Sequence, residues 1–289
     1  MRQRAFDAWL GSRSSGASLL GLLLLTGCED EVESGAAQTQ PVSVRFSAMV
    51  GSTPWQCGNL YEGVGSTEAA LQPQDLRFFV HGVELIRADG SAAAVQLDDV
   101  TNWQANQVAL LDFEDGRGKC TTGTPDLRSE VTGLVAPGEY VGLRFSVGVP
   151  FSENHKNAAI APAPLAQSAL SWNWQQGYIF LRFEGGTSAG RYEVHLGSTG
   201  CTGTTGNITG CSRPNRPVVT LPSFDTATQT VVFDLLQLLA DSDLTRNAGD
   251  SVGCASAATD PDCQGPFDHL GLDLGSGSVT GGQDVFRAE

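Results

Sequence analysis

The chain has 289 residues, of which 35 are glycine and 17% are charged, and its formal net charge is −15. This acidic balance argues against nucleic acid and anionic lipid surfaces as partners, and it suits cations or a basic partner protein. Since no long stretch keeps the 3.6-residue apolar period of a helix, the sequence predicts an all-β fold with many turns.

The first 27 residues predict a lipoprotein signal peptide. Three arginines precede an apolar run, ASLLGLLLLTGC, which is too short to span a bilayer as a helix. The run ends in Leu25-Thr26-Gly27-Cys28, which resembles a bacterial lipobox and implies cleavage before Cys28 and lipidation of its thiol. By a similar resemblance to sorting signals, Glu29 favours transfer to the outer membrane. The alternative is an ordinary secretory peptide with an incidental cysteine.

The remainder of the chain divides into a tether and one domain. Residues 28–40 are acidic and polar without periodicity, so they predict a flexible tether. Residues 41–289 are enough for one large domain with its own core. Contact with a membrane would then be made only through the lipid on Cys28.

Short runs rich in β-branched and aromatic residues predict the strands of a two-sheet β-sandwich. The runs occupy residues 42–49, 76–86, 107–113, 139–148, 177–184, 191–197, 216–221 and 228–235. One or two short helices are expected within residues 164–174 and 233–242. The segment 197–216 and the tail from Leu244 are polar, and we expect them to be long loops that carry disulfides in place of a hydrophobic core.

Six cysteines remain after Cys28, and an even number in an exported chain predicts three disulfides among fifteen possible pairings. They are Cys57, Cys120, Cys201, Cys211, Cys254 and Cys263. The last four enclose two short loops rich in Gly, Ser or Pro, so local pairs are the simplest arrangement, and Cys57 would then pair with Cys120. A zinc site is the alternative, although no CxxC occurs.

Four histidines are candidate metal ligands, because neutral imidazole is the commonest side-chain ligand for copper and zinc. His81 and His195 lie within predicted strands, His155 follows a strand in SENHKN, and His269 lies in the tail. For any one of them alone, an ordinary half-buried histidine is the simpler interpretation. Two strand histidines that meet in one sheet would be a stronger signal.

The segment SWNWQQGYIFLRFEGG carries two tryptophans, Trp172 and Trp174, one residue apart. The two strands that follow should form a hairpin, and opposite charges favour pairing of Arg182 with Glu193. In that register His195 shares a face with both tryptophans. Direct contact between Trp174 and His195 would require the chain to bend before the first strand of the hairpin, because a straight strand separates them by about 20 Å.

The acidic stretch LLDFEDGRGKC contains Asp112, Glu114 and Asp115. Carboxylates suit calcium, but their spacing lacks the pattern of an EF-hand loop. A solvated turn is therefore the preferred interpretation, and calcium is a weaker structural prediction. The sequence contains no nucleophile, metallohydrolase or nucleotide-binding motif in a useful context, so it predicts no enzyme activity.

Five segments together resemble the MbnP family of exported proteins, which is described by four cysteines and a W-x-W motif. The segments are LRFFVHGVEL, WQANQVALLDFEDGRGKCTTGTP, GEYVGLRFSVGVPFSENHKN, APAPLAQSALSWNWQQGYIFLRFEG and YEVHLGSTGC. The resemblance runs from about residue 42 to residue 235. It assigns the family cysteines to Cys57, Cys120, Cys201 and Cys211, and it leaves the pair Cys254 and Cys263 as an addition.

The resemblance implies an extracytoplasmic protein that binds one copper ion and is not itself an enzyme. In the family, a di-haem partner of the MbnH type, similar to cytochrome c peroxidase, oxidises a tryptophan to kynurenine. The kynurenine provides an aniline nitrogen and a ketone oxygen, and with two histidines it forms a mononuclear copper site. The first candidates for ligands are His81 and His195, followed by His155. The candidates for the oxidised residue are Trp172 and Trp174, followed by Trp103.

The alternative function is that of a binding module on the cell surface. A disulfide-stapled β-sandwich could present the two indoles of the W-x-W motif as an aromatic platform for a sugar or a peptide. The presence or absence of copper, and of a chemically altered tryptophan, distinguishes the two functions.

Overall fold

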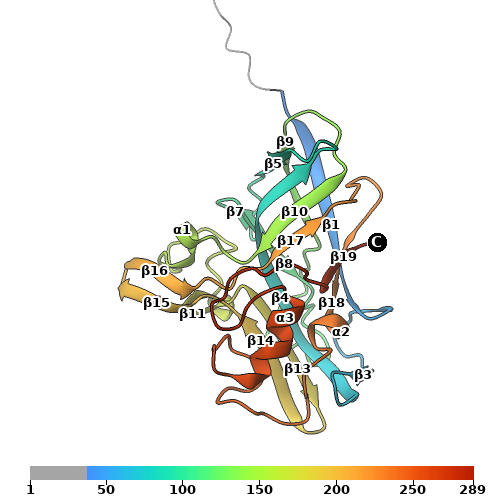
Figure 1. Cartoon of the computed structure of the whole chain (residues 1–289), viewed down its shortest axis with the longest axis vertical. Helices are drawn as coiled ribbons and strands as arrows, with labels where there is room; N and C mark the ends of the chain where they lie inside the picture. The colour runs from blue at the N-terminus through green and yellow to red at the C-terminus, as the bar shows by residue number, and fades with distance from the viewer. Residues whose placement is uncertain (1–37) are drawn as a thin grey trace, which may run out of the picture. The chain divides into compact units, whose positions relative to one another are not determined.

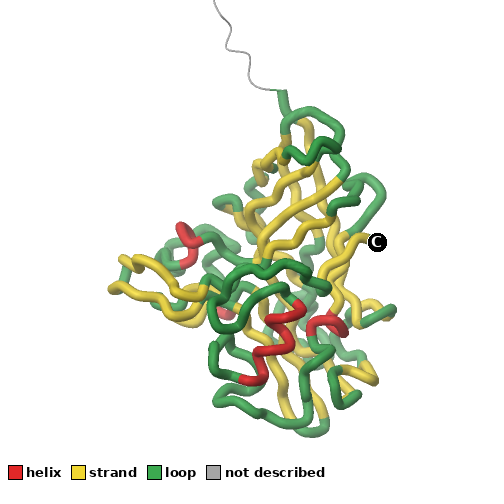
Figure 2. Tube along the Cα trace, viewed as in Figure 1, coloured by secondary structure: helices red, strands yellow, loops and turns green. Residues whose placement is uncertain are grey.

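The computed structural model describes residues 38–289, which belong to one unit by their contacts. The predicted signal peptide, the lipidation of Cys28 and nearly all of the predicted tether lie outside the described residues. Within residues 38–289, no helix is both long and apolar enough to cross a membrane. Strands and loops dominate, and the helices are short (Figure 2).

Two large sheets are present, consistent with the predicted all-β sandwich. The smaller has the strand order β19–β18–β1–β9–β6, and β2 pairs with β1. Its strands are β1 (Gln40–Val50), β2 (Thr53–Pro54), β6 (Gln96–Leu97), β9 (Glu130–Val135), β18 (Val231–Asp234) and β19 (Phe286–Ala288). Because β1 pairs with β18 in parallel, segments from both ends of the described chain lie side by side (Figure 1).

The larger sheet has the order β14–β13–β4–β10–β17. Strands β3, β5 and β8 also pair with the long strand β4, and β7 pairs with β8. Its strands are β3 (Tyr61–Val64), β4 (Ala69–Ile86), β5 (Ala92–Ala94), β7 (Gln104–Ala105), β8 (Val108–Asp112), β10 (Gly142–Val147), β13 (Leu181–Thr187), β14 (Gly190–Leu196) and β17 (Val218–Leu221).

Two small hairpins and five short helical segments complete the fold. They are α1 (Phe151–Asn154), η1 (Ser168–Leu170), β11 (Ser171–Asn173), β12 (Gly177–Tyr178), β15 (Thr199–Thr204), β16 (Asn207–Arg213), α2 (Leu235–Leu238), η2 (Pro261–Cys263) and α3 (Gln264–His269). The hairpin β15–β16 projects at one side of the described unit, near α1 (Figure 1).

The core between the two large sheets is built around aromatic rings. Phe78 of β4 lies 5.5 Å from Phe233 and 5.6 Å from Phe286, measured between ring centroids. Phe145 of β10 lies 5.5 Å from Phe46 of β1. Each of these contacts joins the larger sheet to the smaller one, so the rings hold the two faces together by apolar burial and by stacked or edge-on contact.

Strand β4 is buried on both of its faces. Phe78 faces the core, while the next residue, Phe79, faces the opposite way and packs 5.8 Å from the ring of Tyr178. The hydroxyl of Tyr178 donates a hydrogen bond of 2.6 Å to the carbonyl of Leu165. This covering layer explains the continuous apolar run in β4, and it contains the W-x-W motif.

The C-terminal tail differs from its prediction as a polar loop without a core. Phe267, Leu270 and Leu272 are buried, and Phe286 of β19 belongs to the central cluster of rings. The prediction was wrong because the tail is rich in Gly, Ser and Asp, and its apolar alternation at Leu270, Leu272 and Leu274 spans only five residues. Only the folded chain brings them together.

Two further segments differ in detail from their predictions. The segment 197–216 contains the hairpin β15–β16 where a loop was expected. In the segment 164–174, the only helical element is the single turn η1, and the chain continues directly into strand β11. The W-x-W motif therefore lies on a strand and its turn.

The six cysteines after Cys28 form three disulfides. The pairs are Cys57–Cys120, Cys201–Cys211 and Cys254–Cys263. These are the pairs that the loop spacing favoured. Three disulfides in one domain are typical of a protein that folds outside the reducing cytoplasm.

Candidate functional site

The W-x-W motif lies on a small hairpin that turns back on itself. Trp172 is in β11, Trp174 is in the turn, and Asn173 pairs with Gly177 at the start of β12. The side chain of Asn173 accepts hydrogen bonds of 2.9 Å from two backbone amides of the turn. Gly177 has a φ of +81°, which glycine adopts at little cost. The chain therefore does bend before Gly177, although Trp174 lies beside His155 and not beside His195.

Trp172 is half-buried and packs on the backbone at Gly197, just after β14. A Cβ atom at Gly197 would lie 2.5 Å from Cζ3 of Trp172 and 2.8 Å from the carbonyl oxygen of Tyr178. Alternate residues of a strand share a face, so Trp172 lies over the face of β14 that also carries His195.

Substitution of Gly197 by Ala is expected to displace the indole of Trp172. The new methyl group cannot fit between the ring and the carbonyl of Tyr178, and overpacking of this kind costs about 1–3 kcal/mol. The free energy of unfolding in urea and the near-ultraviolet circular dichroism of tryptophan should both change. An unchanged signal and stability would show that Trp172 does not depend on Gly197.

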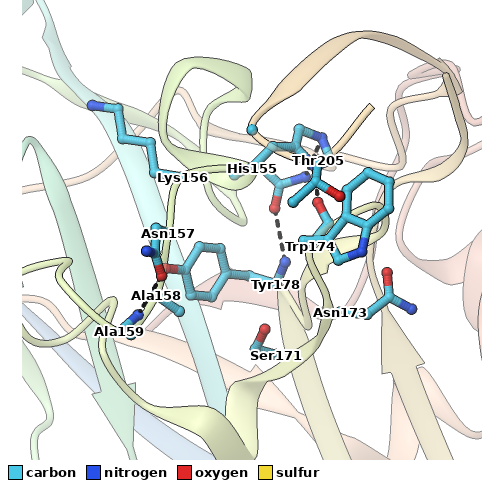
Figure 3. A pocket seen from close by; sticks show the side chains of 13 residues that line it. His155, Lys156, Asn157, Ala158, Ala159, Ser171, Asn173, Trp174, Tyr178 and Thr205 are labelled. Carbon is cyan, nitrogen blue, oxygen red and sulfur yellow. Dashed lines mark hydrogen bonds between the residues drawn. The ribbon is translucent and has the colours of Figure 1, made fainter. Parts of the chain in front are cut away.

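A pocket of about 430 Å³ opens beside Trp174. Its walls come from the loop after α1, from the hairpin β11–β12 and from the tip of the hairpin β15–β16. His155 and Trp174 lie toward one end, with Asn157 and Ala159 toward the other (Figure 3). Since 44% of Trp174 is exposed, an outside molecule can reach its indole.

His155 is held between Trp174 and the disulfide Cys201–Cys211. Its Nδ1 lies 3.4 Å from the carbonyl oxygen of Trp174, and a carbonyl can only accept, so Nδ1 carries the proton. Its Nε2 accepts a hydrogen bond of 3.1 Å from the side-chain amide of Asn154 and lies 3.3 Å from Sγ of Cys211. The lone pair of the ring is therefore on Nε2.

His81 has the same tautomer for the same reason. Its Nδ1 donates a hydrogen bond of 2.8 Å to the carbonyl oxygen of Gly148, which leaves the lone pair on Nε2. Metal-binding histidines usually donate their second ring nitrogen to a carbonyl or a carboxylate, which orients the ring. His81 is therefore arranged as a metal ligand would be.

The pKa values of both of these histidines are lowered in the folded protein. Burial is the main cause that lowers the pKa of His81 to about 4 and that lowers the pKa of His155, and the charge of Arg216 lowers both further. The guanidinium of Arg216 lies 4.9 Å above the ring of Phe180 and donates a bond of 2.7 Å to the carbonyl of Val149. Neutral imidazole is the form that binds a metal.

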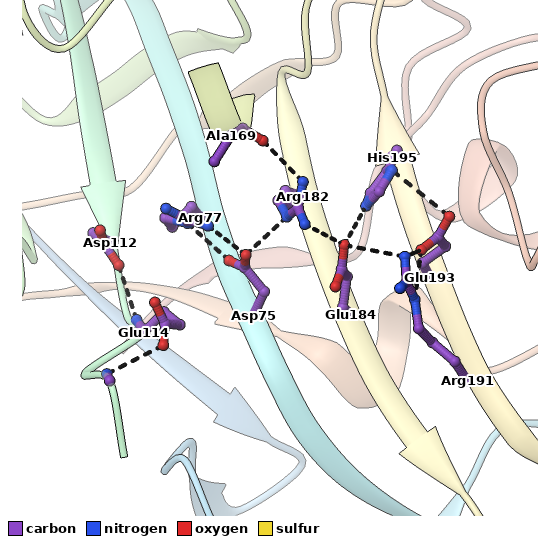
Figure 4. A network of polar contacts seen from close by, with 11 residues as sticks. Asp75, Arg77, Asp112, Glu114, Ala169, Arg182, Glu184, Arg191, Glu193 and His195 are labelled. Atoms are coloured by element: carbon purple, nitrogen blue, oxygen red, sulfur yellow. Dashed lines mark hydrogen bonds and ion pairs between the residues drawn. The ribbon is translucent and has the colours of Figure 1, made fainter. Parts of the chain in front are cut away.

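His195 has different surroundings, in a row of charged side chains that crosses several strands (Figure 4). Its Nε2 lies 3.0 Å from Oε1 of Glu184, and its Nδ1 lies 3.8 Å from Oε1 of Glu193. Glu184 also pairs with Arg182 at 2.5 Å and with Arg191 at 3.6 Å. Although these three groups lie close enough to hold a cation, the two arginines already neutralise the carboxylates.

The register of the hairpin β13–β14 differs from the one expected from charge. Arg182 lies opposite His195, and Glu184 lies opposite Glu193. The turn decides this register, because Thr187 pairs with Gly190 across a two-residue loop. The charges instead pair along each strand and with β4, where Asp75 accepts a bond of 2.8 Å from Arg182.

The other end of this row contains the acidic stretch that was considered for calcium. Asp112, Glu114 and Asp115 each accept a hydrogen bond from the backbone amide two residues ahead, at 2.9–3.1 Å. This is the geometry of a turn, but Asp112 and Glu114 are buried where solvated side chains were expected. Burial raises the pKa of Asp112 to about 7 and also raises the pKa of Glu114.

Asp112 is expected to make the protein less stable as the pH rises. Since its pKa is raised in the folded state, the unfolded chain loses the proton first, and stability falls between about pH 4 and the folded pKa of about 7. Substitution of Asp112 by Asn keeps the acceptor oxygen but removes the charge. Urea titrations should show that Asp112→Asn raises the free energy of unfolding at pH 5 and at pH 8. The increase should be larger at pH 8 than at pH 5, by more than about 1 kcal/mol. Equal gains would contradict the raised pKa.

Trp103 lies apart from the candidate histidines. It lines a different pocket, of about 410 Å³, together with Asp112, Asp126 and Arg77. None of the three candidate histidines lines that pocket in the described part of the chain. The structure thus brings Trp174 close to His155 and places Trp172 over the face of β14 that carries His195. Trp103 has acidic neighbours instead.

Sequence reasoning missed several residues that shape the site. Gly148 and Asn154 bond to ring nitrogens of the two histidines, Arg216 adds to the lowering of both pKa values, and Gly197 leaves room for Trp172. Only Asn154 had a local signal, because it directly precedes His155. The others are far from the histidines in the sequence, so no spacing pattern could have shown the contact.

Comparison with known proteins gives two matches. The family model for MbnP matches residues 39–256. Among solved structures, MbnP from Methylosinus trichosporium is similar, with 35% sequence identity and a TM-score of 0.78 over 87% of this chain and 98% of that chain. Among curated protein sequences, none matches.

Proposed function

This chain belongs to the MbnP family, and from this premise we propose that it is an exported copper-binding protein. Two histidines and a kynurenine would hold a single copper ion. A di-haem partner of the MbnH type would make the kynurenine, so this chain is the substrate of an enzyme and not an enzyme. The three disulfides support a place outside the cytoplasm, where a lipid on Cys28 would anchor the protein in the outer membrane.

The observation that carries the proposal is the shared arrangement of His81 and His155, of which His155 contacts the backbone of Trp174 in the W-x-W motif. In both His81 and His155 the Nδ1–H donates to a backbone carbonyl, and the lone pair of the ring is on Nε2. Copper has the highest affinity among the divalent first-row metals and favours imidazole nitrogen. The residues present therefore fit a copper ion, and we assign His81 and His155 as its protein ligands.

His195 is the less suitable ligand, although the sequence placed it in the first choice. Its two ring nitrogens face Glu184 and Glu193, and it serves a network that joins β13 to β14. Its Nε2–H donates to Glu184, and its other ring nitrogen lies inside the buried row, where Arg191 also pairs with Glu193. Its place in a strand of the same sheet as His81 is explained by that structural role.

Trp174 is our choice for the oxidised residue. It is exposed at the mouth of the pocket, and its backbone contacts His155. Conversion to kynurenine removes one carbon and adds one oxygen, and it creates an aniline nitrogen that can bind a metal. Trp172, two residues before Trp174, packs on Gly197, and we propose that it relays an electron to the partner.

Intact mass and metal analysis together test the proposal. The protein is produced with and without a di-haem partner, purified, exposed to copper and dialysed. We expect a mass change of one carbon lost and one oxygen gained, localised to the W-x-W peptide, and one copper ion per chain only with the partner. An unchanged tryptophan in a protein that still binds one copper ion would refute the kynurenine ligand, and the absence of copper in the converted protein would refute the copper site.

The aromatic platform for a sugar or a peptide is the second candidate. The exposed ring of Trp174 and the amides of Asn157 and Asn173 line the same pocket, which is the combination that stacks on and hydrogen-bonds to a sugar. In this case the unconverted protein would bind ligand, and the mass of its tryptophans would not change.

A further inference from the structure

The disulfide Cys201–Cys211 lies against His155, at the rim of the proposed copper site. Sγ of Cys211 is 3.3 Å from Nε2 of His155. The two sulfur atoms and an imidazole nitrogen lie within 4.8 Å of one another. Neither of the other two disulfides has a histidine in such a group among the described residues. We propose that reduction of this disulfide creates a second metal site, in which Cys201, Cys211 and His155 bind Cu(I).

The chemistry of these three side chains favours this ion. Thiolates are soft ligands that select Cu(I), and imidazole also suits copper. In the oxidised protein each sulfur is bonded to the other and has no thiolate to offer. A Zn²⁺ ion in a structural site almost always takes four ligands, whereas this group provides three.

The hairpin that carries the disulfide should keep its shape after reduction. Strands β15 and β16 pair only with each other, and Cys201 lies directly opposite Cys211. Backbone pairs on both sides of the cysteines, such as Thr199 with Arg213 and Thr204 with Asn207, continue the hairpin. The ladder therefore holds the two sulfur atoms near each other and near His155 without the covalent bond.

Reduction of the disulfide Cys201–Cys211 requires a reductant, and a dithiol supplies the electrons. An extracytoplasmic dithiol gives two electrons and two protons to the disulfide Cys201–Cys211 and itself becomes a disulfide. The bond between Cys201 and Cys211 breaks, and each sulfur becomes a thiol. Binding of Cu⁺ then releases thiol protons. Attack by the dithiol requires access, and Cys211 is only half-buried, in a hairpin whose outer residues are exposed. By contrast, Cys254 and Cys263 are both fully buried.

The second site shares His155 with the proposed kynurenine site but does not depend on kynurenine. The two sites would exclude each other, because one imidazole nitrogen binds one metal. Reduction of the disulfide would then make the two sites compete for His155. The test uses protein whose tryptophans are unmodified, so that failure of the kynurenine proposal leaves this inference intact.

The first measurement locates the reducible disulfide. The chain as exported, produced without a haem partner, is treated with dithiothreitol without oxygen under conditions that keep it folded by circular dichroism. It is then alkylated with iodoacetamide and mapped by mass spectrometry. We expect label on Cys201 and Cys211 and protection of Cys254 and Cys263. Absence of label on Cys201 and Cys211 in the folded protein would overturn the inference.

The second measurement is Cu(I) binding by the reduced protein, in competition with bicinchoninate. We expect one Cu(I) per chain, and affinity at least about tenfold weaker in His155→Ala. The control variant His269→Ala removes a histidine that contacts only carboxylates, and it should bind as the unaltered protein does.

Two further samples test the Cu(I) site in different ways, so that misfolding of a single variant cannot decide the result. The double variant C201S/C211S, and the unaltered protein alkylated after reduction, should both lose the Cu(I) site. Retention of Cu(I) in either sample, or full affinity in His155→Ala, would show that other groups bind the ion and would refute the proposed site.

Discussion

Replacement of Trp174 by Phe is expected to abolish the chemical conversion of the protein and its tight binding of copper. Phenylalanine keeps an aromatic wall in the pocket but has no indole to open, so no aniline nitrogen can form. Loss of one ligand should weaken copper binding by more than about 100-fold, because even residues that only orient ligands contribute 10–100-fold. Intact mass after co-expression with the di-haem partner, and copper content after dialysis, measure the two effects.

Trp172→Phe is the matched control, because it removes an indole two residues away that packs on Gly197. This variant should still be converted and should still bind copper, although conversion will be slower if Trp172 relays electrons. Conversion of the Trp174 variant together with loss of conversion in the Trp172 variant would reverse the assignment. If both variants are fully converted, the W-x-W motif is not the precursor, and Trp103→Phe becomes the decisive variant.

Substitution of His81 or His155 by Ala is expected to produce the second largest effect. Each variant should weaken copper binding by more than about 100-fold, while the tryptophan is still converted, because neither imidazole is needed to open the indole. This combination of an altered mass and a lost metal would distinguish a ligand from a residue that docks the partner. A variant that loses both properties would indicate a disturbed surface for the partner.

The control for the histidines is His195→Ala. This variant should keep its copper, since both ring nitrogens of His195 face glutamates. Its free energy of unfolding should fall by about 1.5–3 kcal/mol, as expected when a buried hydrogen bond to a charged group is lost. The decrease is limited by Arg182 and Arg191, which still pair with Glu184. Loss of copper in this variant, with retention in His155→Ala, would restore His195 as the ligand.

The class of fold could be predicted because its signals are local. Each strand of the sandwich carries its own apolar and β-branched residues, and β4, β10 and β14 lie where the sequence placed strands. The three disulfides also followed from spacing, since two of them close short loops. The tail after residue 244 was predicted wrongly as a polar loop, because its buried apolar residues form only short runs among many Gly, Ser and Asp residues.

The sequence by itself determined the family, the all-β class and the set of histidines and tryptophans from which a site could be built. Only the tertiary structure decided how these residues are grouped. The tautomer of His81 depends on Gly148, 67 residues away, and the lowered pKa values of His81 and His155 come first from burial and then from the charge of Arg216. The reason is physical: burial, charge and hydrogen bonding set whether an imidazole can bind a metal, and the partners that provide them meet only when the chain is folded.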